Sequence, residues 1–115
     1  MSISNWYSQI GTGDVSWGHS GIGSYREPWE TPEKYLKHSP LTYVENVKTP
    51  LLMMAGEYDL RCPVSQSDQL FYALKRLGKE VEYIRFAGEN HMLTKASNRE
   101  YRTRHLVRWF EKYLK

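Results

Sequence analysis

The chain has 115 residues, of which 40% are hydrophobic and 25% charged, and its formal net charge is +3 at pH 7. This composition is typical of one soluble globular domain and excludes a disordered or fibrous chain. The positive and negative charges are interspersed, which argues against nucleic-acid binding. A single cysteine cannot form an internal disulfide, and no apolar run approaches the roughly 18 residues of a membrane span. We therefore expect a cytoplasmic protein.

The first part of the chain, residues 1–48, is interrupted by glycines and prolines. These residues break any regular hydrophobic period, so we expect a loop-rich region with one short helix. That helix is predicted over Pro32 to His38, with Thr31 as its N-cap and Pro32 at the first helical position.

Residues 49–115 have the pattern strand, helix, strand, helix. An unbroken apolar run of strand length comes first, as in a parallel strand covered on both faces. An apolar stripe at helical spacing then ends at a glycine, and an alternating run and an amphipathic stretch follow. The four elements are expected over Leu51–Ala55, Pro63 or Val64 to Gly78, Val81–Phe86 and Asn98–Leu114. They form a βαβ unit with parallel strands and a C-terminal helix, an α/β fold.

Two parallel strands do not form a stable sheet alone, because a strand covered on both faces also needs neighbours at both edges. The run Leu51–Ala55 would leave one edge unpaired. We therefore expect either a homo-oligomer or a missing N-terminal portion of the same fold.

Two polar segments follow the predicted strands at their carboxyl ends, where open α/β sheets place their chemistry. The first runs from Gly56 to Pro63 and contains Asp59; the second, Gly88-Glu89-Asn90-His91, contains a histidine. A carboxylate and an imidazole brought together in this way have the residue types of the acid and base of a catalytic triad.

Several stretches carry a family resemblance through their order and spacing. They are Ser4 to Ser8, Pro28-Trp29-Glu30 with Pro32-Glu33, Ser39-Pro40-Leu41, Lys48 to Leu52, Gly56 to Pro63 and Gly88 to His91. Together they resemble the C-terminal part of the catalytic domain of the prolyl oligopeptidase family of serine peptidases, especially its acylaminoacyl-peptidase-like bacterial members. The resemblance implies an α/β-hydrolase fold, whose nucleophile, acid and base follow one another as Ser, Asp and His.

The resemblance assigns roles to three residues. Asp59 matches the triad acid, His91 the triad base, and Arg61 the position whose guanidinium binds a substrate backbone carbonyl. For Arg61 an ion pair with Glu57 or Glu89 is an equal alternative. No cofactor is implied.

The neighbouring thiol and the other histidines have structural interpretations. Cys62 is expected to be a buried structural thiol. His19, His38 and His105 lack the spacing of a zinc site. Five aromatic residues of the N-terminal part could line a substrate pocket: Trp6, Tyr7, Trp17, Tyr25 and Trp29.

The nucleophile is the missing element. Gly18-His19-Ser20-Gly21-Ile22-Gly23 superficially matches G-x-S-x-G, but that elbow needs a preceding buried strand, and Ile22 occupies the place of the second glycine. We therefore expect the serine upstream of Met1 and no activity from this chain alone.

Three functions stay open at this stage. The first is a fragment of a serine peptidase that hydrolyses short or N-acylated peptides through an acyl-enzyme. The second is a fragment of an esterase, which shares the triad chemistry on the same fold. The third is a non-catalytic, self-associating module.

Overall fold

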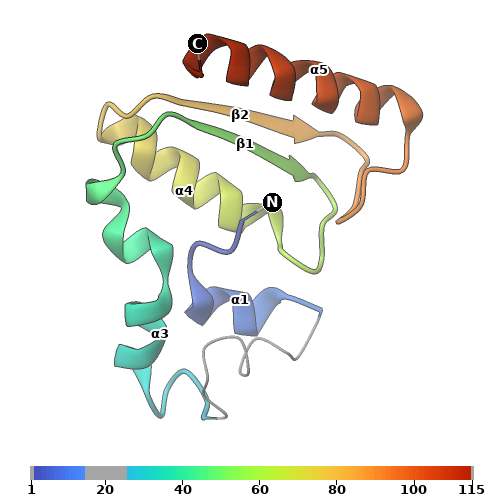
Figure 1. Ribbon diagram of the computed structural model, residues 1–115. Coiled ribbons are helices and arrows are strands. Elements are labelled where there is room, and N and C mark those ends of the chain that lie inside the picture. Colours follow the sequence, from blue (N-terminus) through green and yellow to red (C-terminus); the bar gives the residue numbers. More distant parts are fainter. Residues whose placement is uncertain (1, 15–25, 115) are drawn as a thin grey trace.

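The computed structural model describes residues 2–14 and 26–114 (Figure 1). Its elements in chain order are α1 (Trp6–Thr12), α3 (Pro32–His38), the 3-10 helix η1 (Pro40–Asn46), β1 (Leu51–Gly56), α4 (Val64–Arg76), β2 (Val81–Phe86) and α5 (Ala96–Tyr113). The predicted order strand, helix, strand, helix for the second half is confirmed, with element bounds shifted by no more than about two residues.

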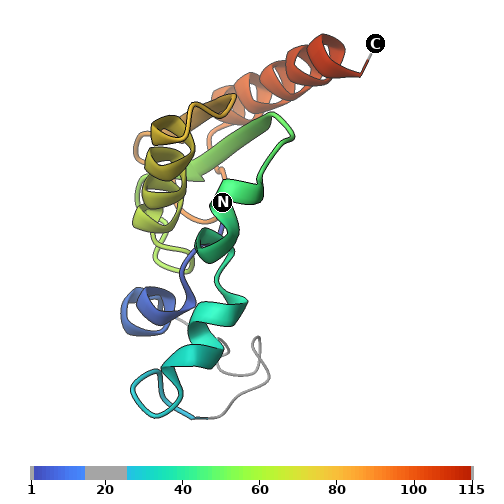
Figure 2. The same ribbon diagram turned by 90° about the vertical axis from the view of Figure 1, so that its left-hand side faces the viewer.

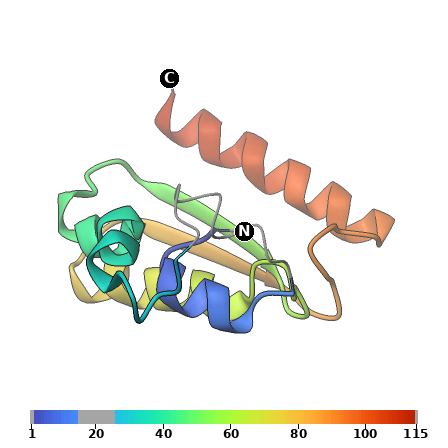
Figure 3. The same ribbon diagram turned by 90° about the horizontal axis from the view of Figure 1, so that it is seen from below.

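The two strands form a parallel sheet. Their register runs from Leu51 opposite Val81 to Gly56 opposite Phe86. Helix α4 connects them and covers one face of the sheet, while α5 lies across the other face, as Figures 1 and 3 show. Because the strands are parallel, their carboxyl ends lie at the same end of the sheet, where the two polar loops begin.

Helix α4 buries Leu74, in its last turn, completely. Its C-cap is Leu77, and the next residue, Gly78, has φ 67°, so the predicted glycine at the C′ position is confirmed. The predicted apolar stripe is only partly covered, because Leu77 is 41% exposed. A sheet of two strands is too narrow to cover the whole helix face.

The apolar face of helix α5 is also only partly buried. Trp109 is its buried residue, whereas Phe110 and Leu114, which the sequence places on the same apolar face, are 53% and 74% exposed. Three polar contacts fix the helix to β2 and to the turn before it: Arg108 with Glu82, and Lys112 and Tyr113 with Glu80. The amphipathic period of α5 is therefore real, but part of its apolar face lies open.

The N-terminal part holds more structure than the sequence predicts. Helix α3 is present at the predicted bounds, although the Thr31 side chain makes no capping hydrogen bond. The expectation of one short helix is wrong, because α1 and η1 also form. Helix α1 has only seven residues and contains Gly11, so its intrinsic propensity is low and its stability comes from tertiary contacts.

Those contacts centre on Gln66, a fully buried side chain of α4. Its Oε1 accepts hydrogen bonds from the backbone N–H groups of Ser4 (3.1 Å) and Asn5 (2.9 Å), and its Nε2 donates to Ser8 Oγ (2.8 Å). Ser4 Oγ also donates to the Gln66 carbonyl (2.6 Å). The segment before α1 is thereby tied to α4, and Figure 2 shows α1 and α3 away from α5.

Strand β1 pairs only with β2 among the residues that the structure describes, so its other edge is joined to no strand within them. A cavity of about 340 Å³ follows this edge. Its lining consists of Ser2, Leu51, Leu52, Met53 and Met54 with Ser67 and Leu70 of α4 and Leu106 of α5. In the described ranges no helix has the length and apolar character needed to cross a membrane.

Candidate active site

The loops after β1 and β2 are joined by backbone hydrogen bonds. Glu57 N–H donates to the Phe86 carbonyl (3.0 Å) and Tyr58 N–H to the Glu89 carbonyl (2.9 Å). The Glu57 carboxylate also accepts from Gly88 N–H (3.1 Å). Because the strands are parallel, their carboxyl ends lie side by side and the two loops act as one unit.

Gly56 makes the close approach of these loops possible. A Cβ at this position would lie 2.1 Å from the Asn90 carbonyl oxygen and 2.6 Å from that of Glu89. Both atoms belong to the backbone and cannot rotate away. The last residue of β1 therefore has to be glycine for the base loop to lie against the acid loop.

Asp59 is the centre of the site. Its side chain is inaccessible to solvent, and Oδ1 accepts hydrogen bonds from the backbone N–H groups of Arg61 (3.0 Å) and Cys62 (2.8 Å). Nδ1 of His91 lies 3.1 Å from each carboxylate oxygen. The predicted contact between Asp59 and His91 is confirmed.

The geometry fixes the orientation of the His91 ring. With Nδ1–H donating to Asp59, Nε2 is the nitrogen left for other chemistry, and the side chain is 27% exposed. Within residues 2–14 and 26–114, Nε2 has no hydrogen-bond partner. The pair therefore has the arrangement in which a carboxylate orients an imidazole that can accept a proton.

Glu89, two residues before the base, is 1% exposed. Four donors surround its carboxylate: the Thr94 and Lys95 N–H groups, the Thr94 hydroxyl and the Asn98 side-chain amide. The hydrogen bonds from Thr94 N–H and Asn98 lower the pKa of Glu89 to about 2. The sequence suggested Glu89 only as an ion-pair partner of Arg61, because no local pattern predicts that the following loop folds back onto its carboxylate.

Arg61 is exposed, and its backbone rather than its side chain is fixed. Its carbonyl accepts from Gln9 Nε2 of α1 (2.7 Å). The alternative ion pair with Glu57 or Glu89 is absent from the part of the chain that the structure describes. Those two carboxylates already accept hydrogen bonds from Gly88 and from the donors around Glu89.

The remaining nucleophile and metal candidates have structural roles or lie outside the described residues. Cys62 is buried, and burial, reinforced by the Asp59 charge, raises its pKa, as expected for a structural thiol. His105 stacks on Tyr101, with Nδ1 3.0 Å from the Tyr101 carbonyl oxygen. No cluster of potential metal ligands occurs among the described residues. The glycine-rich segment with His19 and Ser20 lies outside them.

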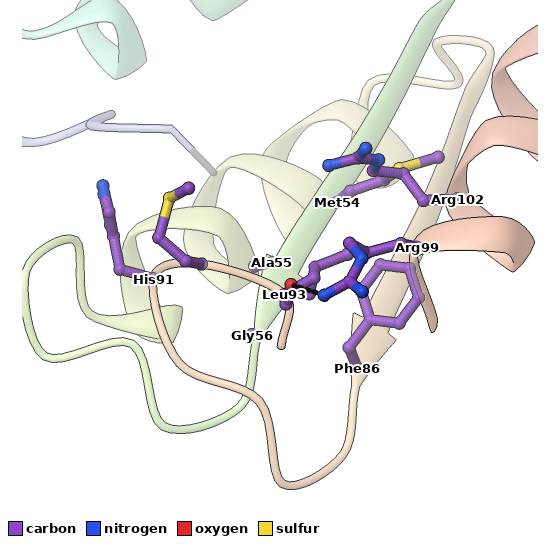
Figure 4. A pocket seen from close by; sticks show the side chains of 9 residues that line it. Met54, Ala55, Gly56, Phe86, His91, Leu93, Arg99 and Arg102 are labelled. Carbon is purple, nitrogen blue, oxygen red and sulfur yellow. Dashed lines mark hydrogen bonds between the residues drawn. The ribbon is translucent and has the colours of Figure 1, made fainter. Parts of the chain in front are cut away.

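A pocket of about 340 Å³ opens beside the base on the α5 side of the sheet. Its lining is Met54, Ala55, Gly56, Phe86, His91, Met92, Leu93, Arg99 and Arg102. Figure 4 shows Phe86 and Arg99 together and His91 apart from them on its loop. Of the aromatic residues expected to line a substrate pocket, Trp6, Tyr7 and Trp29 are not among the lining residues, and Trp17 and Tyr25 lie outside the described ranges.

A parallel βαβ unit with an aspartate and a histidine in contact beyond its strand ends defines the chain as a partial α/β-hydrolase fold. The family model described as "Prolyl oligopeptidase family" matches residues 1–115. The chain therefore belongs to the prolyl oligopeptidase family of peptidases.

Its relatives are much longer proteins. The chain is 40% identical to the Bacillus subtilis peptidase YuxL over 98% of this chain and 18% of that one. It is 35% identical to the acylamino-acid-releasing enzyme of Arabidopsis thaliana over 75% of this chain and 11% of the relative. The uncomplexed acylaminoacyl peptidase of Pyrococcus horikoshii superposes with a TM-score of 0.84 at 36% identity, over 95% of this chain and 18% of that one. The chain thus spans less than a fifth of the length of these relatives.

Proposed function

We propose that this chain supplies the acid and the base of a serine peptidase active site, and that the nucleophilic serine lies outside it. The observation that carries the proposal is the contact of His91 Nδ1 with both carboxylate oxygens of Asp59 at 3.1 Å. Membership of a peptidase family supports the reaction class.

In the proposed reaction, Nε2 of His91 takes the proton of the serine hydroxyl as its oxygen bonds to the acyl carbon of the substrate. Asp59 accepts the Nδ1 proton in a hydrogen bond and stabilises the imidazolium. The scissile C–N bond then breaks, and His91 gives the proton to the leaving amine. Water, activated by the same nitrogen, hydrolyses the acyl-enzyme and regenerates the serine.

The proposed substrates are short or N-acylated peptides. Support comes from relatives that are acylamino-acid-releasing enzymes and acylaminoacyl peptidases. We assign Arg61 to the backbone carbonyl of the substrate, because the residue is exposed while its backbone is fixed by Asp59 and Gln9. Arginine suits this task because it stays charged and presents several donors in one plane.

An esterase fragment is the second candidate, since ester and amide hydrolysis use the same acid and base. A comparison of turnover on matched peptide and ester substrates separates the two. The family match favours the peptidase.

We further propose that the isolated chain associates with a second copy through the edge of β1 that faces away from β2. The cavity along this edge is lined mostly by apolar side chains, and an edge that is joined to no described strand favours strand addition. A two-fold pairing of edges is the commonest closed solution.

The single free cysteine fits the reducing cytoplasm that we assign to the chain.

Labelling with a fluorophosphonate probe tests the placement of the nucleophile. The isolated chain is expected to remain unlabelled and to turn over neither peptide nor ester substrates. A Ser20→Ala variant is the matched control. Stoichiometric labelling that disappears in this variant would place the nucleophile at Ser20 and overturn the proposal.

A further inference from the structure

We propose that Glu89 is a positioning residue that holds the His91 loop in the geometry required for contact with Asp59. The proposal rests on the proposed function and adds to it the group that fixes the base. Glu89 is buried and separated from His91 by one residue, yet none of its side-chain hydrogen bonds involves Asp59 or His91. It acts through the backbone of the loop.

The carboxylate closes the loop that contains His91. Oε2 accepts from Thr94 N–H (2.8 Å) and Thr94 Oγ1 (3.0 Å), while Oε1 accepts from Lys95 N–H (3.0 Å) and Asn98 Nδ2 (2.7 Å). Residues 90–93 are therefore spanned by one side chain. The far end of this loop is fixed to the first turn of α5.

The near end of the loop, at Glu89 and Asn90, is fixed to the loop that contains Asp59. The Glu89 carbonyl accepts from Tyr58 N–H at 2.9 Å, and the Asn90 backbone packs against Gly56. Glu89 consequently links three parts of the site: its carbonyl contacts the acid loop, its side chain contacts α5, and the base lies between. Loss of the side-chain anchor would free residues 90–93 at one end only.

A carboxylate is needed because four donors converge on it. Two ionised oxygens offer about four acceptor sites, whereas a glutamine offers one oxygen and would direct its own N–H groups at donors. A negative charge is also favourable at the N-terminus of α5. The low pKa of Glu89 keeps it ionised throughout the range in which a histidine base works.

The tautomer of the His91 ring shows whether the Glu89 side chain holds the His91 loop in place, and it can be measured in a chain that has no activity. An imidazole that donates Nδ1–H to Asp59 is held in one neutral tautomer, whereas an unanchored ring also populates the Nε2–H form. Long-range ¹H–¹⁵N correlation spectra of the ¹⁵N-labelled full chain at about pH 9, above the ordinary histidine range, measure the ratio of the two forms.

Glu89→Gln is expected to lower the ratio of the Nδ1–H to the Nε2–H form by about tenfold, since charge-assisted hydrogen bonds are lost. Glu100→Gln removes an exposed charge from α5, paired with Arg104, and is expected to leave the ratio unchanged. Asn98→Ala removes one donor without changing the charge and should give a smaller decrease.

Two results overturn the proposal. One is a folded Glu89→Gln chain with the wild-type ratio. If that variant does not fold, the other is a wild-type ratio in both Asn98→Ala and Thr94→Val. A wild-type chain with no preference for the Nδ1–H form would instead contradict the assignment of Asp59 and His91, so the two proposals fail separately.

Discussion

Replacing Gly56 by alanine should separate the acid loop from the base loop. The new Cβ would lie 2.1 Å from the Asn90 carbonyl oxygen, 2.6 Å from the Glu89 carbonyl oxygen and 2.9 Å from the Asn90 carbonyl carbon. Favourable contacts between such atoms begin near about 3.5 Å. The base loop must therefore retreat by about 1 Å or more.

The cost follows from the contacts that this movement disrupts. Overpacking of a rigid site costs about 1–3 kcal/mol. The hydrogen bond from Tyr58 N–H to the Glu89 carbonyl, 2.9 Å in the native chain, contributes about 1 kcal/mol more. We expect Gly56→Ala to lower the free energy of unfolding by about 2–4 kcal/mol, a large share of the total for a small domain.

Urea unfolding followed by tryptophan fluorescence, at one fixed protein concentration, measures the change. Gly11→Ala is the matched control, because nothing lies within 4 Å of the added Cβ. Alanine is also the better helix former, so this control should be neutral or stabilising by up to about 1 kcal/mol. A Gly56→Ala chain as stable as the wild type, with the His91 tautomer unchanged, would refute the argument that the loops are in close contact.

Three further predictions concern stability and assembly. Gln66→Ala leaves the buried N–H of Ser4 and the partly buried N–H of Asn5 without an acceptor and should cost about 2–4 kcal/mol in urea unfolding, whereas Gln69→Ala on the same helix should cost less than about 1 kcal/mol. The pKa of Glu89 falls from its ordinary value of 4.5 to about 2 on folding, so its contribution is complete above about pH 4.5 and is lost as the pH falls toward about 2; the urea midpoint should drop over this range, and less in Glu89→Gln. Light scattering over a dilution series should give the mass of a dimer at micromolar concentration, and a monomer with a cooperative melt would contradict pairing at the β1 edge.

The strands and long helices were predictable because their signals are local. The apolar run of β1, the alternation of β2 and the helical period of α4 each lie within one element. Helix α1 was missed because its stability depends on a distant side chain, Gln66, which no window around residues 6–12 contains. Nor could the periods predict how much of α5 lies open, since that depends on what covers the sheet.

The candidate site was predictable in part for the same reason. Parallel strands bring their carboxyl ends together, so Asp59 and His91 could be paired from the order of the elements and the family motifs. The ion pair considered for Arg61 failed because its partners, Glu57 and Glu89, already accept other hydrogen bonds. Whether a carboxylate already accepts hydrogen bonds depends on the path of the loop around it rather than on a sequence period.

The roles of Asp59 and His91 as acid and base can be measured by segment replacement in a relative. This chain would replace the matching segment of the Pyrococcus horikoshii acylaminoacyl peptidase, to which it is 36% identical, and peptide turnover would be measured with His91→Ala and His38→Ala side by side. We predict that the hybrid turns over an N-acylated peptide, that His38→Ala retains this activity, and that His91→Ala lowers kcat by at least about 10³-fold while the protein stays folded. A folded His91→Ala hybrid with undiminished turnover would contradict the account.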